Sequence, residues 1–494
     1  MLTTDEIKLF LEEDAASELK KQAEEGQRYY DGKHDILDYK LFYWNANDEL
    51  VEDKARSNVK IPHPFFTELV DQAVQYIMSD KEGFVMSDDP KLQTELDVYF
   101  NKNKRFKVEL SNVITGVQAK GWDYMHASLG KKEARLVFEH ADCLGVVEVE
   151  GRFADDGKDQ FIWKYVDRVD KEGKTQFKVL VIDDENTYYH TQTDNGEIVF
   201  DDSVELNPRP HATYINKKDK KLYSKPFGFL PLFRMDNNKK KISHLRAVKP
   251  LIDDYDLMAS SLTNNLIDFE NPIHLVKGFD GNSNDDLNRL QQNLKTRRLM
   301  SLPDEGGMEI HTVDVPYQAR EAKMNIDKEG IYHFGMGLNT SGLKDTAATT
   351  NIAIKAAYSG LELRCSKVID QLELFLMDLV EVVLDEINEK NGTGYMPEQV
   401  YIDIQPEIMA NELENAQIKL TEAQKQQIVI NTLLALADKL DNETLMIEVC
   451  DALDLDYEEI KDKLPDPDES MNNIIDAGGE LGNIEPVDGG GVGE

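Results

Sequence analysis

Apolar residues recur at helical spacing near the start of the chain. Thr3 and Glu6 have the spacing of a capping box, and apolar residues from Ile7 onward share one helix face. An amphipathic helix is therefore predicted to open the chain and to end near Gly32. A second stretch, residues 62–79, begins with prolines and then carries apolar residues three and four apart. This pattern predicts a helix that packs against a core.

The apolar spacing changes to two between about residues 134 and 233. Short runs rich in β-branched and aromatic residues, RLVFEH, FIWKYV, FKVLVI and TYYHTQ, are separated by acidic turns that contain glycine. Asn195-Gly196 is a strong signal for a type I′ hairpin. Together these runs predict a meandering antiparallel sheet.

A helix with two contrasting faces is predicted next. Its apolar positions alternate steps of three and four, as in a seam between helices packed lengthwise: Leu245, Val248, Ile252, Tyr255, Ala259, Leu262, Leu266 and Phe269. Its opposite face is polar and mostly acidic: Asp253, Asp254, Asp256, Asn264 and Asp268. One side is expected to seek apolar neighbours while the other stays wet and acidic, although an ordinary surface helix has much the same pattern.

The segments that follow alternate between small units and helices. Residues 272–315 contain strand-like runs, among them RRLMSL and MEIHTV, and a helix that opens at Asp285, while residues 322–334 have helical spacing. The stretch MGLNTSGLKDTAATTN is rich in Gly, Thr and Ala and poor in residues that fill a core. It is predicted to be a loop.

One long helix is predicted over residues 352–388. It is apolar on nearly every side but interrupted by carboxylates, which indicates a buried helix and not a membrane span. Residues 400–405 have the pattern of a strand, and two or three helices are expected between residues 406 and 464. The last thirty residues contain seven Gly and no Lys or Arg, which is typical of a flexible acidic tail.

Charge and cysteine usage narrow the class of protein. The 494 residues hold 56 Lys and Arg against 94 Asp and Glu, a formal net charge of −38, so the average surface repels phosphate backbones and anionic membranes. This charge excludes an ordinary DNA-binding protein. It is compatible with a protein that surrounds DNA without binding it tightly. An excess of acidic residues also has a simpler explanation, which is that it keeps a large protein soluble. The 3 Cys residues form no C-x-x-C pair, and the N-terminus lacks the apolar stretch of a signal peptide, so a reducing cytoplasm is expected.

Catalytic and metal-binding motifs occur only as near misses. A phosphate loop needs Lys directly after its second Gly, but Gly342 is followed by Leu343, Lys344 and Asp345. DGNSNDD, which begins at Asp280, lacks the turn glycine and closing glutamate of a calcium loop. His140 and Asp142 would point to one side of a strand and Cys143 to the other, so they would not bind one metal ion together. No cofactor, metal site or enzymatic activity is predicted, although an acidic enzyme with an unrecognised site and a monomeric scaffold or adaptor protein remain alternatives.

Four segments, in order, resemble the SPP1-like portal family of tailed phages along most of the chain. They are RYYDGKHDIL, NVKIPHPFFTELVDQAVQYIMSD, KPFGFLPLFRMDNN and VKPLIDDYDLMASSLTNNLIDFENP. The resemblance implies an α+β portal fold, mainly α with an antiparallel β meander: a mixed wing, a helical stem, a small α/β clip and a helical crown. The implied parts are a wing (1–240), first stem helix (241–271), clip (272–315), second stem helix (316–337), tunnel loop (338–351), long wing helix and strand (352–406), crown (407–464) and disordered acidic tail (465–494).

The resemblance also implies a function and partners. Such a chain assembles in the host cytoplasm and forms a closed ring, a dodecamer in the virion, at one capsid vertex. Double-stranded DNA passes through the ring during packaging and ejection, while a separate terminase hydrolyses ATP. The implied partners are other copies of the chain, the large terminase subunit, a head–tail adaptor protein, and the major capsid and scaffolding proteins, with no membrane.

Three groups of candidate site residues follow from this resemblance and the charge pattern. The tunnel loop is expected to touch DNA through Thr340, Ser341, Lys344, Thr346, Thr349, Thr350 and Asn351. An acidic channel face is expected from Asp253, Asp254, Asp256 and Asp268. Docking of terminase or adaptor is expected at Arg289, Lys295, Arg297 and Arg298, with Lys239, Lys240 and Lys241 as further basic residues, although solvated loops and helix ends carry similar charge runs.

Overall fold

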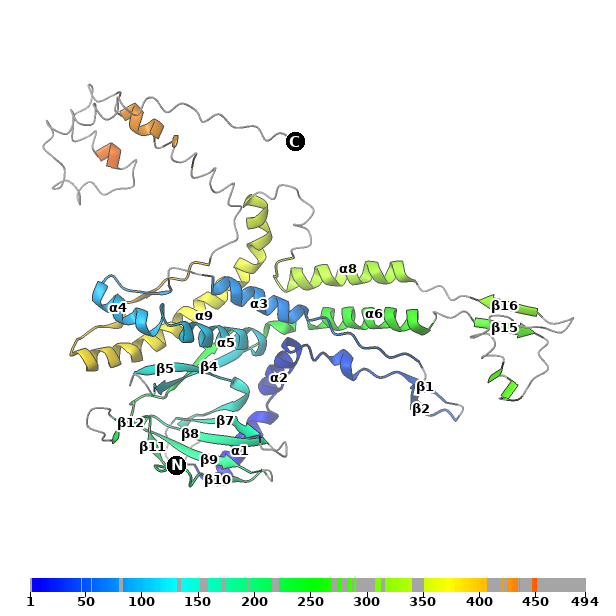
Figure 1. Ribbon diagram of the computed structural model, residues 1–494, viewed down its shortest axis with the longest axis horizontal. Coiled ribbons are helices and arrows are strands. Elements are labelled where there is room, and N and C mark those ends of the chain that lie inside the picture. Colours follow the sequence, from blue (N-terminus) through cyan, green and yellow to red (C-terminus); the bar gives the residue numbers. More distant parts are fainter. Residues whose placement is uncertain are drawn as a thin grey trace. The chain divides into compact units, whose positions relative to one another are not determined.

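The computed structural model describes residues 2–45, 47–54, 56–79, 83–130, 135–151, 159–169, 175–193, 196–215, 222–268, 273–277, 307–311, 316–339 and 351–406, with short pieces at 283, 285–286, 288–289, 420, 424–425, 427–433, 435 and 447–450. The chain divides into two compact units, residues 1–347 with 355–408 and residues 348–354 with 409–494. The sheets and the paired helices shown in Figure 1 belong to the first unit. The expected crown is described only in short helical pieces, and the expected tail lies outside the described residues.

Two helices open the chain, α1 (Thr4–Ala16) and α2 (Glu18–Tyr30). The capping box is confirmed, because Thr3 accepts a hydrogen bond from the Glu6 backbone N–H and the Glu6 carboxylate accepts one from the Thr3 N–H. The prediction of one continuous helix to Gly32 was wrong. Ser17 has an extended backbone and its hydroxyl caps the N-terminus of α2, so it ends one helix and starts the next.

The predicted meander is confirmed for residues 146–200, but the run RLVFEH, which was expected in the same sheet, pairs with a strand of a second sheet. The meander's order β10-β9-β8-β7-β6 is wholly antiparallel, and β11 pairs with the start of β9 on the same edge as β10. The strands are β6 (Val146–Val149), β7 (Gln160–Val169), β8 (Thr175–Ile182), β9 (Asn186–Gln192), β10 (Ile198–Phe200) and β11 (Arg209–Pro210). Ile7 of α1 is buried among apolar side chains of β6, β7 and β8. Gly196 has φ +79 in the β9–β10 turn, while Asn195 lies outside the described residues.

A second sheet, β14-β4-β5, packs against the helices of the main core. Its strands are β4 (Trp122–Leu129), β5 (Leu136–Ala141) and β14 (Leu232–Asp236), and the helices are α3 (Phe65–Ile77), α4 (Pro90–Tyr99) and α5 (Lys104–Lys120). Short strand pairs complete this part: β12 (Ala212–Ile215) with β13 (Leu222–Lys225), and β3 (Val85–Met86) with β17 (Tyr401–Ile402). Short 3₁₀ turns lie at η1 (Asp35–Asp38), η2 (Cys143–Gly145), η4 (His244–Ala247) and η6 (Pro397–Gln399).

The long helix is α9 (Asn351–Asn391), with 41 residues. It is longer at both ends than predicted, and its buried residues, among them Leu372, Leu376 and Leu379, join the main core. The prediction of a buried helix is therefore confirmed for one side of α9. Leu363 and Leu374 lie outside that side and are 57% and 64% exposed.

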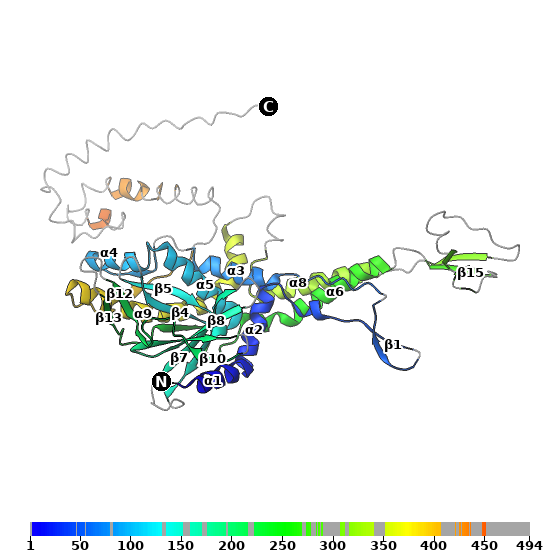
Figure 2. The ribbon, with the colours of Figure 1, turned by 60° about the horizontal axis from the view of Figure 1, so that its bottom comes forward.

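Two helices leave this core beside each other, as Figures 1 and 2 show: α6 (Lys249–Asp268) and α8 (Tyr317–Phe334). Between them in sequence, β15 (Ile273–Lys277) and β16 (Gly307–His311) form an antiparallel pair. Ser283 caps a helical piece that includes the predicted start at Asp285, while the predicted strand RRLMSL lies outside the described residues. Within the described parts of the chain, none of the helices has both the length and the apolar character needed to cross a membrane.

Candidate functional site: the paired helices and the segments that hold them

The helices α6 and α8 pack antiparallel. Leu251 near the start of α6 lies against Gly330 near the end of α8, where an added Cβ would stand 3.2 Å from the leucine side chain. Farther along, Lys323 of α8 donates hydrogen bonds to Asp254 of α6 and to Asp327 of its own helix. These contacts use Leu251 and Asp254, which are not among the predicted seam positions. Of the seam, Tyr255 packs on the rings of His63 and Phe65 at 4.8 and 4.9 Å, and Leu266 is 55% exposed, so the prediction that the seam joins the two helices was wrong. Ile252 and Ile331 anchor the helix pair in the main core.

An extended segment, residues 57–63, runs along the polar side of α6. Every second backbone N–H in the segment donates to a side chain on every fourth residue of the helix. The pairs are Ser57 N to Asp268 Oδ1 (3.1 Å), Val59 N to Asn264 Oδ1 (2.7 Å), Ile61 N to Ser260 Oγ (3.0 Å) and His63 N to Asp256 Oδ1 (2.9 Å). The spacings match because two extended residues and four helical residues both advance about 6 Å. We call Asp256, Ser260, Asn264 and Asp268 the polar row.

The polar row corrects the expectation of a wet acidic face. Asp256 is 0% exposed and, besides the His63 N–H, it contacts His34 Nδ1 at 2.6 Å and His63 Nδ1 at 2.9 Å. Its expected place on the channel face was therefore wrong for the isolated subunit. Asp253 accepts hydrogen bonds from Tyr29 and Lys249. A channel role for Asp253, Asp254 and Asp268 stays a prediction.

The segment RYYDGKHDIL forms the other wall of this junction. Tyr29 is buried and stacks on the His34 ring at 4.6 Å. Asp35 accepts from Arg28 at 2.7 Å and from Lys249 at 2.6 Å. Burial opposes ionisation of the Asp35 carboxyl, but these two cations outweigh it and lower its pKa to about 2. The segment thus ties α2 to the start of α6, which sequence spacing did not indicate.

The chain that leaves α8 is fixed as far as Leu338. The Leu338 N–H donates to Gln72 Oε1 (2.8 Å), and Gln72 Nε2 donates back to the Leu338 carbonyl (3.0 Å). Arg364 of α9 is buried and donates to Gln118 Oε1 at 2.6 Å and to the Gly335 carbonyl at 3.4 Å. Burial lowers the pKa of this guanidinium to about 10. The predicted tunnel loop therefore starts from a rigid base.

Most expected DNA-contacting and docking residues lie outside the described residues. These are Thr340, Ser341, Lys344, Thr346, Thr349 and Thr350 in the loop, and Lys295, Arg297 and Arg298 in the predicted clip. Asn351 is the first residue of α9. Arg289 is exposed, as are Lys239 and Lys240, whereas Lys241 stands over the Trp122 ring at 5.6 Å. The DNA-contacting and docking roles stay predictions.

The metal candidate in the sequence has a different geometry from the one expected. Strand β5 ends at Ala141 and Asp142 caps a 3₁₀ turn, so Asp142 and Cys143 do not point to opposite sides but gather with Asp123, their ligand atoms within 4.8 Å. The Lys120 ammonium lies 2.9 Å from Asp123 and 2.7 Å from Asp142. It therefore supplies the positive charge that a metal ion would bring to these carboxylates. Burial raises the pKa of the Cys143 thiol well above its usual value, which disfavours the thiolate that binds metals.

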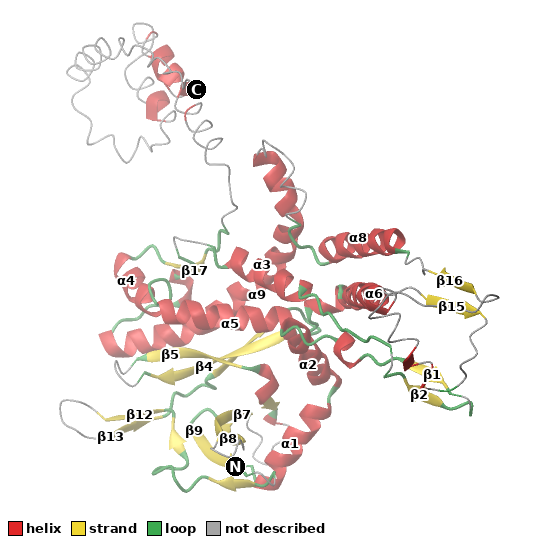
Figure 3. Cartoon of the chain, turned by 45° about the vertical axis from the view of Figure 1, so that its right-hand side comes forward, coloured by secondary structure: helices red, strands yellow, loops and turns green. Residues whose placement is uncertain are grey.

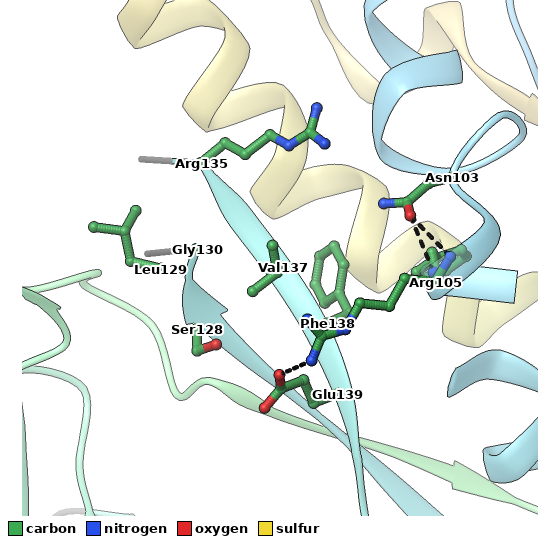
Figure 4. Close-up of a pocket in the computed structure, with 10 residues that line it drawn as sticks. Asn103, Arg105, Ser128, Leu129, Gly130, Arg135, Val137, Phe138 and Glu139 are labelled. Carbon is green, nitrogen blue, oxygen red and sulfur yellow. Dashed lines mark hydrogen bonds and ion pairs between the residues drawn. The ribbon is translucent and has the colours of Figure 1, made fainter. Parts of the chain in front are cut away.

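A pocket of about 610 Å³ lies between the start of α5 and strands β4 and β5. Figure 4 shows Arg105 reaching across β5 to Glu139, at 2.5 Å, and Arg135 at the other end of the pocket. The remaining lining side chains are apolar or neutral. This lining contains neither a nucleophile next to a base nor a pair of carboxylates, so it does not indicate a catalytic site.

Comparison with known proteins places the chain among phage portal proteins. A family model described as "Phage portal protein, SPP1 Gp6-like" matches residues 11–463. Because this is most of the chain, the chain belongs to the SPP1 Gp6-like portal family, and the resemblance seen in the four sequence segments is confirmed. The family is one of structural capsid components, and portal proteins of phage particles are part of the virion.

Individual relatives agree with this family. The chain is 24% identical over 345 residues to the portal protein of Bacillus phage SPP1. The aligned region covers 69% of this chain but only 65% of that protein. It is 23% identical over 414 residues to the portal protein of Clostridium phage phiCD119, covering 78% and 85% of the two chains. Among solved structures, a chain from the virion of a native gene transfer agent particle is similar with 12% identity and a TM-score of 0.40, covering 80% of this chain and 91% of that one.

Proposed function

We propose that this chain is the subunit of a closed portal ring, twelve copies in the virion, at one vertex of a phage capsid. Double-stranded DNA would pass through the ring when a terminase packages it and again when it is ejected. The observation that carries the proposal is family membership over residues 11–463. The antiparallel pair α6–α8, in which residues 57–63 are hydrogen-bonded along α6, would supply the stiff element that such a ring repeats by rotation.

Assembly of the purified full-length chain tests this proposal. Mass photometry and negative-stain electron microscopy are expected to show closed rings with an axial hole. A chain that stays monomeric at every salt concentration contradicts the proposal and favours a monomeric scaffold, an adaptor or a soluble enzyme. A ring without an axial hole also contradicts it, because DNA could not pass.

We further propose that residues 338–351 contact DNA in the channel. The rigid base formed by Gln72 and Leu338 would hold the small polar loop in place, and Lys344 would make one salt-sensitive phosphate contact per subunit. Lys344→Glu is expected to leave ring assembly intact but to reduce DNA packaging or retention in infectious particles. Lys91→Glu, at an exposed position on α4, is the control, because it makes the same change of charge outside the loop. Equal packaging by the two variants contradicts this role.

The basic residues of the predicted clip are proposed to dock the terminase or the head–tail adaptor. Arg289 is exposed in the described part of this segment, and the family's structural role implies partners at the vertex. Reversing the charges of Arg289, Lys295, Arg297 and Arg298 together is expected to preserve the ring and to abolish salt-dependent terminase binding. Lys91→Glu with Lys104→Glu on α4 and α5 is the control. Unchanged binding by the fourfold variant refutes the docking assignment.

ATP hydrolysis is proposed to belong to the terminase and not to this chain. The phosphate-loop near miss has Lys344 displaced and followed by Asp345, so it lacks the geometry that cradles phosphates. The purified ring is expected to show no steady ATP turnover. Turnover that survives purification and disappears in a Lys344→Ala variant contradicts this proposal.

A further inference from the structure

A short hairpin between η1 and α3 exposes apolar side chains on both of its faces. It consists of β1 (Phe42–Trp44) and β2 (Leu50–Glu52), paired so that Tyr43 lies opposite Val51 and Trp44 opposite Leu50. Phe42, Trp44 and Leu50 share one face and are 49%, 69% and 56% exposed. Tyr43 and Val51 are exposed on the other face. We call this element the β1–β2 hairpin.

The β1–β2 hairpin is firmly mounted. At its base, Asn58 Nδ2 donates to the Tyr39 carbonyl at 3.2 Å, and Ser57 and Val59 are hydrogen-bonded to the polar row of α6. At its tip, the Asn45 side chain accepts from the Asn47 and Glu49 N–H groups at 2.9 and 3.0 Å. Both ends of the hairpin are therefore closed by hydrogen bonds, which holds its apolar side chains in one place.

Such an element needs a partner. A two-stranded hairpin alone is only marginally stable in water, because neither of its faces is covered. Contiguous exposed apolar side chains on a monomer mark interaction sites, and Trp, Tyr and Phe dominate the energetic centres of protein interfaces. The β1–β2 hairpin combines these features in a chain with a formal net charge of −38.

The helix α8 of the same chain also exposes apolar side chains. Figures 1 and 3 show α6 lying between the β1–β2 hairpin and α8. On α8, Ala319, Ala322 and Ile326 are three and four residues apart and exposed, Ile326 by 65%, beside the position of Lys323, which contacts Asp254 of α6. Because α6 lies between the hairpin and α8, the hairpin does not cover these side chains within one subunit.

We propose that the β1–β2 hairpin of each subunit docks on the exposed side of α8 that carries Ala319, Ala322 and Ile326 in the next copy. A projecting element on one side and its acceptor on the other define a heterologous contact, which closes into a ring when the rotation between copies is regular. This inference rests on the proposed ring and adds the segment that joins neighbouring subunits. The proposed contact also gives a role to the hydrogen bonds between residues 57–63 and α6, because these bonds set the direction in which the hairpin projects.

Accessibility of Trp44 tests the proposal. The chain has 3 Trp, so Trp122→Phe with Trp163→Phe leaves Trp44 as the only indole reporter. Assembly is expected to shift its emission to shorter wavelength and to reduce acrylamide quenching. Hydrogen–deuterium exchange of residues 39–56 in the parent chain provides the same comparison without substitutions, and is expected to slow in the ring.

Substitutions locate the contact. Trp44→Ser and, separately, Ile326→Asp are expected to keep the subunit folded by circular dichroism and to weaken assembly about 30-fold, as loss of an interface hot spot does. Val169→Ser, at a similarly exposed position at the end of β7, is the control and should assemble normally. A parent ring in which Trp44 and residues 39–56 remain as accessible as in the monomer overturns this inference but not the proposed function. A parent that never assembles overturns both.

Discussion

Removing the Asp256 carboxylate should loosen the junction between α6 and the segments that precede α3. In Asp256→Ala, three donors lose their acceptor: His34 Nδ1 at 2.6 Å, the His63 backbone N–H at 2.9 Å and His63 Nδ1 at 2.9 Å. The Asp256 and His34 side chains are both 0% exposed, whereas the His63 side chain is 30% exposed. Water can therefore replace the acceptor for the His63 ring but not for the His34 ring.

The magnitude follows from which donors stay buried. A buried donor without a partner costs about 1–3 kcal/mol. We expect Asp256→Ala to lower the free energy of unfolding of the first unit by about 2–6 kcal/mol, the sum for the two donors that water does not reach, His34 Nδ1 and the His63 N–H. Asn264→Ala also removes two hydrogen bonds from the polar row, 2.7 and 3.1 Å long, but at a water-exposed position, so about 1 kcal/mol is expected.

Urea unfolding followed by circular dichroism, with the midpoint and slope reported separately, measures both variants. Hydrogen–deuterium exchange of residues 57–63 gives a local readout, and these amides should exchange faster in Asp256→Ala than in Asn264→Ala. If the Asp256 variant is destabilised no more than the Asn264 variant, burial does not determine the strength of the polar row and the reasoning fails.

Three further outcomes are expected. Burial and the nearby Arg364 charge outweigh a hydrogen bond to the Gly335 carbonyl and lower the pKa of His244 from 6.5 to about 3. The unfolded chain therefore binds a proton that the folded chain does not bind, and the free energy of unfolding falls by about 1.4 kcal/mol per pH unit below pH 6.5. His244→Gln should reduce this pH dependence of the urea midpoint, and an unchanged pH dependence excludes His244 as its source. Gly26→Ala would place a Cβ 1.9 Å from the Ala119 carbonyl oxygen and should lower the melting temperature through about 1–3 kcal/mol of overpacking, whereas Gly394→Ala, which meets nothing within 4 Å, should not. Ring assembly should tighten in light scattering between about 50 and about 500 mM salt, because screening reduces repulsion between subunits of net charge −38; weaker assembly at high salt would mean that ionic attraction, and not apolar contact, joins the copies.

The elements with a strong local signal were predictable. Alternation of apolar residues indicated the strands of the meander, and steps of three and four indicated the helix α6, because these patterns arise from the geometry of a single strand or helix. The Thr3 cap was also visible. Which side of α6 meets α8 was not predictable in this way. The break at Ser17 was missed although Ser is a frequent cap, since the apolar pattern continues across it.

What covers a face was decided only by the tertiary structure. The sequence determined that Asp256, Asn264 and Asp268 share one side of a helix, and it determined the family to which the chain belongs. It did not determine that this side binds the backbone of residues 57–63, because an extended segment that donates alternate N–H groups carries no periodic side-chain signature. Likewise, the burial of Asp256 against His34 joins residues more than 200 positions apart, and only the folded chain brings them together. The periodicity of a segment reports which residues point the same way, whereas packing decides whether they meet water, backbone or another subunit.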